Sequence, residues 1–234
     1  MTGLKRLGES SLKREEIFGI YGVGGYGTEI LPLVREQLQT FGVSNDSLFF
    51  VDDKIKDGES EIINNQKLIS FNKFKSISAN KYHMVIAISD GKIRKKLTAK
   101  CIDNSVDIFN IQAENVVKLD NVNIGEGYIL SPFVTLTSNI NIGESFQANM
   151  YSYVAHDCNI GDYVTFAPSV KCNGNIEIGS NVYVGTGVII EQGKPDKPLK
   201  IGNNVSISAG TIISKDIPDN VTVMFKRSKL MYIN

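Results

Sequence analysis

The second half of this chain carries an apolar residue at every sixth position, and this period constrains the fold more than any other feature. A six-residue repeat matches neither the 3.6-residue period of an α-helix nor the two-residue period of an ordinary strand. It is typical of a β-helix, in which short strands and corners form successive coils. The repeated slots hold Ile124, Leu130, Leu136, Ile142, Ala148, Val154, Ile160, Phe166, Cys172, Ile178, Val184, Ile190, Ile201, Ile207 and Ile213.

The fifth position of each repeat is mostly small or β-branched, which suits a second inward position near a tight corner. Gly, Asn and Asp cluster between the inward slots, where a corner needs residues that tolerate unusual backbone angles. Three repeats make one three-sided coil. The register breaks once, over residues 191–200 (EQGKPDKPLK), and this segment is predicted to bulge from a corner as an external loop.

The first half alternates between strand and helix patterns. Apolar runs predict strands at residues 17–21, 48–51, 84–89 and 106–111. A helix is expected over residues 28–41, with Pro32 in its first turn, and a basic helix from about Lys92. This alternation indicates a small parallel sheet with helices on its faces. We therefore expect a polar extension over residues 1–15, an α/β domain over 16–115 and a β-helix over 116–234.

Charge and hydropathy exclude several classes of partner. The 234 residues include 25 basic and 25 acidic side chains, whereas nucleic acid or an anionic membrane would need a basic excess. There is no run of 18 apolar residues, and the N-terminal segment is charged where a signal peptide needs an apolar core. The sequence therefore predicts a cytoplasmic protein.

A glycine-rich loop, Gly22-Val-Gly-Gly-Tyr-Gly27, comes directly after the first predicted strand and before the first helix. Exposed backbone N–H groups and the helix dipole favour a phosphate in that position. Asp52 and Asp53 end the next strand, where an acidic residue often binds a ribose. A nucleotide or nucleotide sugar is the favoured ligand. A nicotinamide dinucleotide fits less well in a domain this short, and a purely structural turn is the remaining alternative.

His156 occupies the third place of its repeat, so its side chain is expected to project outward from a coil rather than into the core. A neutral imidazole is suited to removing a proton near pH 7, and Asp157 beside it would raise its basicity. The alternative is an ordinary solvent-facing histidine. The repeat region holds only this one histidine, so a metal-binding cluster of histidines is not expected.

Together these features resemble the bacterial sugar acetyltransferases of the NeuD/PglD type. The resemblance covers roughly residues 16–218, and its most specific parts are residues 21–27 (YGVGGYG), 50–53 (FVDD), 87–96 (AISDGKIRKK) and 156–162 (HDCNIGD). It implies a Rossmann-like α/β domain that holds the sugar nucleotide, followed by a left-handed parallel β-helix. It also implies a homotrimer with acetyl-CoA in a groove between neighbouring β-helices, and no metal.

The resemblance also implies roles for individual residues. His156 would be the general base, tuned by Asp157 as its catalytic partner. The substrate would contact Gly24, Gly25 and Tyr26 on the phosphate side, Asp52 and Asp53 near the nucleoside, and Ser89 in the same pocket. The coenzyme would pass Thr165, Gly174, Thr186 and Ala209. The chain departs from the family pattern at Tyr26 and Thr165, where histidine is usual, in the ending Met224-Phe-Lys-Arg-Ser-Lys, and in the extra loop at 191–200. Its Lys194, Lys197 and Lys200 are hypothesised to meet coenzyme phosphates.

The function that these features favour is N-acetylation of the 4-amino group of a UDP- or dTDP-linked amino-deoxy sugar for surface glycan synthesis. O-acetylation of sialic acid or a related sugar is the alternative within the enzyme class. A non-catalytic structural or ligand-sensing β-helix is the alternative of a different class, and nicotinamide oxidoreduction is a third. The chemistry of the favoured reaction needs only a base and close approach, because a thioester is already activated.

Overall fold

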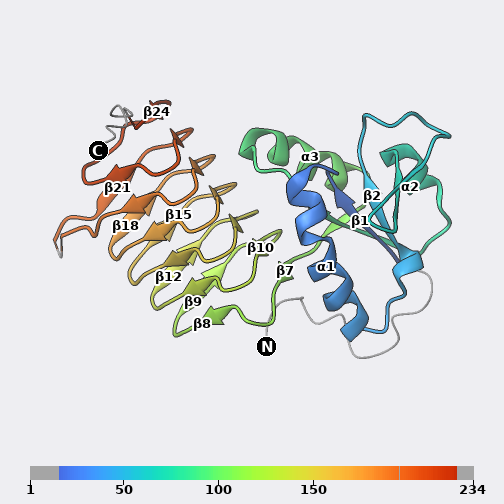
Figure 1. Cartoon of the computed structure of the whole chain (residues 1–234), viewed down its shortest axis with the longest axis horizontal. Coiled ribbons are helices and arrows are strands. Elements are labelled where there is room, and N and C mark those ends of the chain that lie inside the picture. The colour runs from blue at the N-terminus through green and yellow to red at the C-terminus, as the bar shows by residue number, and fades with distance from the viewer. Residues whose placement is uncertain (1–15, 195, 226–234) are drawn as a thin grey trace, which may run out of the picture.

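The computed structural model describes residues 16–194 and 196–225. The extension expected over residues 1–15 lies outside the described residues, as does most of the ending Met224-Phe-Lys-Arg-Ser-Lys. The described chain forms an α/β domain and a long β-helix, with the α/β domain lying beside the first coils (Figure 1). No helix in these ranges is long and apolar enough to cross a lipid bilayer.

The α/β domain is built around one sheet with the strand order β3-β4-β2-β1-β5-β6. All neighbouring strands are parallel except β3, which runs antiparallel to β4 at the edge. Helix α1 covers one face, and α2 and α3 cover the other. Its elements are β1 Glu16–Tyr21, α1 Gly25–Thr40, a 3₁₀ turn Asn45–Ser47, β2 Leu48–Val51, β3 Glu61–Ile63, β4 Gln66–Ile69, α2 Phe71–Ser76, β5 Lys81–Ile86, α3 Gly91–Asp103 and β6 Asp107–Ile108.

Helix α1 starts earlier than the sequence predicts. It begins at Gly25 rather than residue 28, because the Thr28 amide already bonds the Gly24 carbonyl at 3.1 Å. The glycine loop therefore supplies the first turn of the helix itself. The prediction that Pro32 lies in that first turn is wrong: Pro32 lies inside the helix, one turn further on. The apolar stripe is as expected, with Ile30, Leu31, Val34 and Leu38 buried against the sheet.

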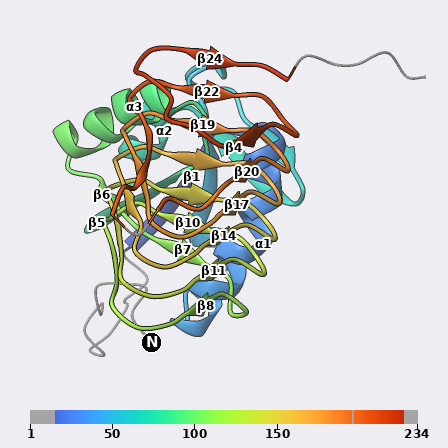
Figure 2. The ribbon, with the colours of Figure 1, turned by 90° about the vertical axis from the view of Figure 1, so that its left-hand side faces the viewer.

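The β-helix is a three-sided prism of parallel strands, whose stacking is seen in Figure 2. Face 1 contains β7 Ile111–Gln112, β10 Ile129–Leu130, β13 Gln147–Ala148, β16 Thr165–Phe166, β19 Tyr183–Val184, β22 Ser206–Ile207 and β24 Thr222–Val223. Face 2 contains β8 Val117–Lys118, β11 Thr135–Leu136, β14 Tyr153–Val154, β17 Lys171–Cys172, β20 Ile189–Ile190 and β23 Ile212–Ile213. Face 3 contains β9 Val122–Ile124, β12 Ile140–Ile142, β15 Asn159–Ile160, β18 Ile176–Ile178 and β21 Leu199–Ile201.

The hexapeptide register is confirmed along the whole prism. Every repeated apolar slot from Leu130 to Ile213 is buried in one continuous core, and Ile124 packs against its end. The β-branched and small residues of the fifth places are buried as well, from Val134 to Thr211. Many corners adopt left-handed backbone angles, and Asn, Asp or Ser often occupies these positions. Residue type therefore matches position in the prism: apolar side chains fill the core, and residues that tolerate left-handed backbone angles lie at the corners.

The first coil begins earlier than expected. Its strand β7 starts at Ile111, whereas the sequence places the start of the β-helix near residue 116. Within the segment 191–200 the hexapeptide ladder is interrupted between β20 and β21, where the backbones of Lys194 and Lys197 bond each other, whereas Leu199 and Lys200 already belong to β21.

Outward side chains of face 1 join the two parts of the chain. Ile111 and Ile129 point away from the prism and are fully buried in the core layer beneath α1. Burying each of these side chains contributes roughly 1.5–3 kcal/mol. The α/β domain is therefore held against face 1.

Candidate active site

His156 lies at the corner between faces 2 and 3, two residues after the end of β14. About half of its side chain is exposed (51%), which confirms the outward position predicted from the register. Its Nδ1 lies 2.7 Å from Oδ2 of Asp157. Because an ionised carboxylate can only accept, Nδ1 is the donor in this pair, and in the neutral form of the ring Nε2 is then the acceptor. This arrangement would allow the ring to accept a proton through Nε2.

Asp157 is held in place from both sides. Its backbone is left-handed, with φ of 59°, and its second oxygen accepts a hydrogen bond from the Asn139 amide at 3.1 Å. The hydrogen bond from His156 and then that from Asn139 lower the pKa of Asp157. The carboxylate therefore remains ionised and fixes the orientation of the imidazole.

Gly174 lies directly beneath the imidazole, one coil further along the same corner. A Cβ at this position would lie 2.6 Å from both Cε1 and Nε2 of His156. The imidazole can therefore occupy this position only because residue 174 has no side chain. Of the residues predicted to line the coenzyme path, this one contacts the candidate base.

The glycine loop has the geometry of an anion site. The N-cap residue is Gly24, so no side chain caps the helix, and the first turn of α1 holds no acidic residue. A Cβ on Gly27 would lie 2.0 Å from the Gly22 carbonyl oxygen, so the chain can turn this tightly only with glycine there. The amides of the first turn are left to bind an external group, and the helix dipole favours a negative charge.

Asp52 and Asp53 lie at the same carboxyl edge of the sheet as the glycine loop, since the Gly22 amide bonds the carbonyl of Val51 at 2.9 Å. Asp52 accepts a bond from the Lys54 amide through one oxygen. Both oxygens of Asp53 lie 2.9 Å from Nζ of Lys100, and Tyr21 donates its hydroxyl to one of them at 2.7 Å. Asp53 is therefore the more tightly held of the two carboxylates.

Ser89 and Tyr26 lie near this edge in different settings. Ser89 is exposed just beyond the end of β5. The Tyr26 hydroxyl, by contrast, is enclosed beside Arg94 and Ser131, and burial raises the pKa of Tyr26. Any contact of Tyr26 with a phosphate at the loop would therefore be made by its backbone amide.

The other predicted coenzyme residues are not in one place. Thr186 and Ala209 are exposed at the corner between faces 1 and 2, stacked in successive coils. Thr165 is buried on face 1, where its hydroxyl donates to the Ser89 carbonyl and accepts from Arg94. The structure thus gives Thr165 a place in the contact between the two domains.

The lysines of the external loop also lie in different surroundings. Lys200 pairs with Glu177 at 2.7 Å on face 3, and Lys197 lies 3.8 Å from Asp216. The loop leaves the prism one coil beyond Gly174, because the Gly193 amide bonds the Gly174 carbonyl. Gly193 and Lys194 therefore lie at the corner that carries His156, where the Asn175 side chain also bonds the Lys194 carbonyl.

Two further residues were missed by sequence reasoning. Asn139 donates a hydrogen bond to Asp157. The sequence pattern that could have predicted this contact is a spacing of one full coil between left-handed corner residues, which are Asn121, Asn139, Asp157 and Asn175. Lys100 pairs with Asp53 across a sequence separation of 47 residues. Nothing in the sequence pattern points to that second pairing.

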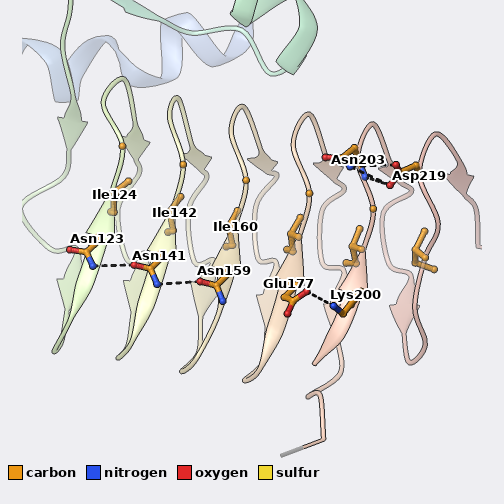
Figure 3. A pocket seen from close by; sticks show the side chains of 18 residues that line it. Asn123, Ile124, Asn141, Ile142, Asn159, Ile160, Glu177, Lys200, Asn203 and Asp219 are labelled. Atoms are coloured by element: carbon orange, nitrogen blue, oxygen red, sulfur yellow. Dashed lines mark hydrogen bonds and ion pairs between the residues drawn. The ribbon is translucent and has the colours of Figure 1, made fainter. Parts of the chain in front are cut away.

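A shallow hollow runs along face 3 and does not include the imidazole (Figure 3). Asn123, Asn141 and Asn159 form a ladder of amide hydrogen bonds at 3.1 and 3.2 Å, and Glu177 pairs with Lys200 further along. These side chains bond one another rather than an external group. The hollow is therefore the outer surface of a sheet, and the exposed imidazole is the better candidate for chemistry.

Known proteins resemble this chain in sequence and in structure. A family described as "PglD N-terminal domain" matches residues 18–101. The GDP-perosamine N-acetyltransferase of Escherichia coli O157:H7 is 41% identical over 183 residues, which is 78% of this chain and 81% of that protein. The solved structure of WeeI from Acinetobacter baumannii AYE is 46% identical, with a TM-score of 0.85 over 88% of this chain and 95% of that one.

A more distant structure shares the fold. PerB from Caulobacter crescentus, solved in complex with CoA and GDP-perosamine, is 21% identical, with a TM-score of 0.71 over 88% of this chain and 92% of that one. This chain thus combines an α/β domain, a left-handed parallel β-helix and an outward histidine. Its curated relative at 41% identity is an N-acetyltransferase. The chain belongs to the PglD-type sugar N-acetyltransferases.

Proposed function

We propose that this protein transfers the acetyl group of acetyl-CoA to the amine of a nucleotide-linked amino-deoxy sugar, with GDP-perosamine as the first candidate acceptor. The observation that carries the proposal is the half-exposed side chain of His156, whose Nδ1 is held by Asp157. The proposed place of action is the cytoplasm, where nucleotide sugars and acetyl-CoA are both available.

The reaction makes few demands on the protein. The sugar nitrogen forms a bond to the thioester carbonyl carbon, the carbon–sulfur bond breaks, and His156 Nε2 accepts the proton that the nitrogen loses. That proton can then pass to the departing sulfur. General base catalysis contributes about 10²–10⁴-fold. Holding the two reactants together supplies much of the remaining acceleration.

The relatives favour guanine as the base of the acceptor, in place of the uracil or thymine predicted from the sequence. The curated relative at 41% identity is named for a GDP-linked sugar. The carboxyl edge of the α/β domain offers a phosphate site at the first turn of α1, and Asp52 and Asp53 at the end of β2. Carboxylate oxygens suit the N–H donors of a purine edge or of a ribose.

We also propose that the active site forms between copies of the chain, as a homotrimer. The α/β domain lies against face 1, whereas His156 lies at the corner between faces 2 and 3, opposite face 1. A sugar held at the carboxyl edge of one chain is therefore on the other side of the prism from the imidazole of that chain. A second copy is needed to supply the base.

The exposed surface of face 2 supports this assembly. Phe133 and Tyr151 stack in parallel at the corner between faces 1 and 2, with ring centroids 4.9 Å apart and 52% and 61% of each residue exposed. Val117 and Ile212 are exposed on the same face. A second copy seated here would also bring Thr186 and Ala209 of one chain toward Gly174 of the next, which suits a coenzyme bound between them.

The test is an assay of purified protein with acetyl-CoA and a matched set of acceptors. The set contains GDP-perosamine, UDP- and dTDP-linked 4-amino sugars, and free sialic acid. We expect release of free thiol and one added acetyl group by mass spectrometry, with the highest kcat/KM for the GDP-linked sugar. Acetylation of none of the nucleotide-linked amines would overturn the proposal. A preference for sialic acid would favour O-acetylation instead.

A further inference from the structure

Arg94 is the largest fully buried side chain of the described residues, with 1% of its surface exposed, and its guanidinium hydrogen-bonds no carboxylate among them, Asp90 acting on it only at longer range. It belongs to the lysine-rich first turns of α3, where the neighbouring basic side chains are on the surface. Burial lowers the pKa of Arg94 to about 10, so the group is still charged at neutral pH. Burying a charge without a counter-ion is costly unless its hydrogen bonds are satisfied.

The guanidinium is satisfied by neutral oxygens from both parts of the chain. Two are backbone carbonyls of the loop that follows β5, those of Ile88 at 2.6 Å and Ser89 at 3.2 Å. The other acceptors belong to the β-helix, namely the carbonyl of Ser145 at 3.1 Å, that of Val164 at 3.3 Å, Gln147 Oε1 at 3.2 Å and Thr165 Oγ1 at 3.0 Å.

The same loop is tied to face 1 by bonds that do not involve Arg94. The Gln147 amide donates to the Ile86 carbonyl at 2.8 Å, and the Thr165 hydroxyl donates to the Ser89 carbonyl at 2.8 Å. Gly91 lies against the next corner, where a Cβ would be 2.5 Å from the Tyr163 carbonyl oxygen. These links therefore join segment 86–91 to the third and fourth coils, at β13, at β16 and at the corner that precedes β16.

This segment is also part of the carboxyl edge at which the nucleotide is proposed to bind. Ala87 lies beside the end of β1, since its amide bonds the Tyr21 carbonyl at 2.8 Å, and Gly22 follows directly. The Tyr26 hydroxyl of the glycine loop is enclosed beside Arg94 as well. A shift of the guanidinium would therefore move the acceptor site relative to the β-helix of its own chain, and so relative to the His156 that a neighbouring copy is proposed to supply.

We propose that Arg94 is a positioning residue for acetyl transfer, which sets the nucleotide-binding edge of the α/β domain at a fixed place on face 1. This inference rests on the proposed function, because it assigns Arg94 to the alignment of the sugar amine with His156 and the thioester. Misplacement by about 1 Å can cost on the order of 10²-fold in rate. Lysine has a single compact ammonium and cannot reach the same six acceptors in a planar array.

The test compares Arg94→Lys and Arg94→Met with wild type. The Met variant removes the buried charge and keeps an unbranched apolar side chain, so it guards against failure to fold. The matched control is Val205→Ala, which removes buried volume from the β-helix core away from this contact. Each protein is assayed with acetyl-CoA and two acceptors, the nucleotide-linked amino sugar and the same sugar without the nucleotide.

We expect a loss of on the order of 10²-fold in kcat for the nucleotide-linked acceptor in both Arg94 variants. The slow rate with the free sugar, which does not use the α/β domain, and the KM for acetyl-CoA should remain within about twofold of wild type. The Val205 control should treat the two acceptors alike. Equal losses for both acceptors in the Arg94 variants would mean a merely structural role, and full kcat would exclude positioning; either result overturns the inference.

Hydrogen exchange of the same proteins tests the inference without activity. The amides of residues 86–94 and 145–147 should exchange faster in the Arg94 variants than in wild type and in the Val205 control. Unchanged exchange overturns the inference. A wild-type protein that acetylates no nucleotide-linked sugar would contradict the proposed function, and the exchange measurement would still decide whether Arg94 fixes this segment.

Discussion

The imidazole of His156 rests on Gly174 of the next coil, so closely that a Cβ at position 174 would lie 2.6 Å from its Cε1 and Nε2. The two residues are one coil apart at the same corner, and the amide of Asn175 bonds the carbonyl of His156 at 2.9 Å. The position of the ring is therefore set by a missing side chain below and a carboxylate beside it.

Gly174→Ala should displace the ring without unfolding the coil. The backbone at Gly174 does not have a positive φ, so alanine introduces the steric contact and no backbone strain. We expect kcat to fall by about tenfold or more, because the base moves by several tenths of an ångström. The measurement is steady-state kinetics alongside thermal unfolding. A variant with wild-type kcat and wild-type stability would mean that the ring has another acceptable position.

Asp157→Asn should separate orientation from packing. Asparagine tolerates the left-handed backbone at this position and can still accept the bond from Asn139, so the fold should be unchanged. The loss of the carboxylate removes the charged acceptor for Nδ1 of His156. We expect kcat to fall by about 10–100-fold with the KM for acetyl-CoA unchanged. Activity equal to wild type would show that the imidazole needs no carboxylate.

An active site shared between copies predicts recovery of activity by mixing two inactive variants. One is His156→Ala, and the other is Gly25→Glu, which puts a carboxylate at the phosphate site; a Cβ on Gly25 meets nothing within 4 Å, so this variant should fold. Random reassembly of equal amounts should restore about a quarter of the sites, since each needs one intact loop and one intact histidine from neighbouring chains. Activity no higher than the sum of the separate variants would place both halves of the site in one chain.

A buried histidine in the α/β domain predicts how stability depends on pH. Burial lowers the pKa of His83 from its ordinary value of 6.5, although Glu16 at 3.0 Å and Asp107 oppose the shift and Lys81 adds to it. The unfolded chain therefore binds more protons than the folded chain below pH 6.5, and stability falls as the pH drops through that value to the lowered pKa.

The measurement is Tm between about pH 7.5 and about pH 5.5 for wild type and His83→Gln. Glutamine does not titrate and can still donate to Glu16. The variant should lose fewer degrees than wild type over this interval. Equal losses in the two proteins would assign the pH dependence to other groups.

The β-helix could be predicted from sequence because its core slots repeat at a fixed spacing, so each inward residue from Leu130 to Ile213 carries its own signal. The outward direction of His156 followed from the same register. The start of α1 was placed too late because the glycine loop does not look like a helical turn, although Gly25 and Gly27 lie in one.

Contacts between distant parts of the chain could not be predicted in this way. The pairing of Asp53 with Lys100 and the burial of Arg94 between domains depend on how the α/β domain docks on face 1. The placement of Thr165 in that contact depends on the same docking. No local sequence pattern predicts this docking, because Asp, Lys, Arg and Thr are residue types that usually lie on the surface.

The most direct test of the account is the kcat of His156→Ala with GDP-perosamine and acetyl-CoA, measured beside wild type and with coenzyme affinity as the control. His156 is half exposed and lies outside the core, so the variant should fold and bind the coenzyme normally. We predict a fall in kcat of about 10²–10⁴-fold. A kcat within a few-fold of wild type would contradict the assignment of this imidazole as the base.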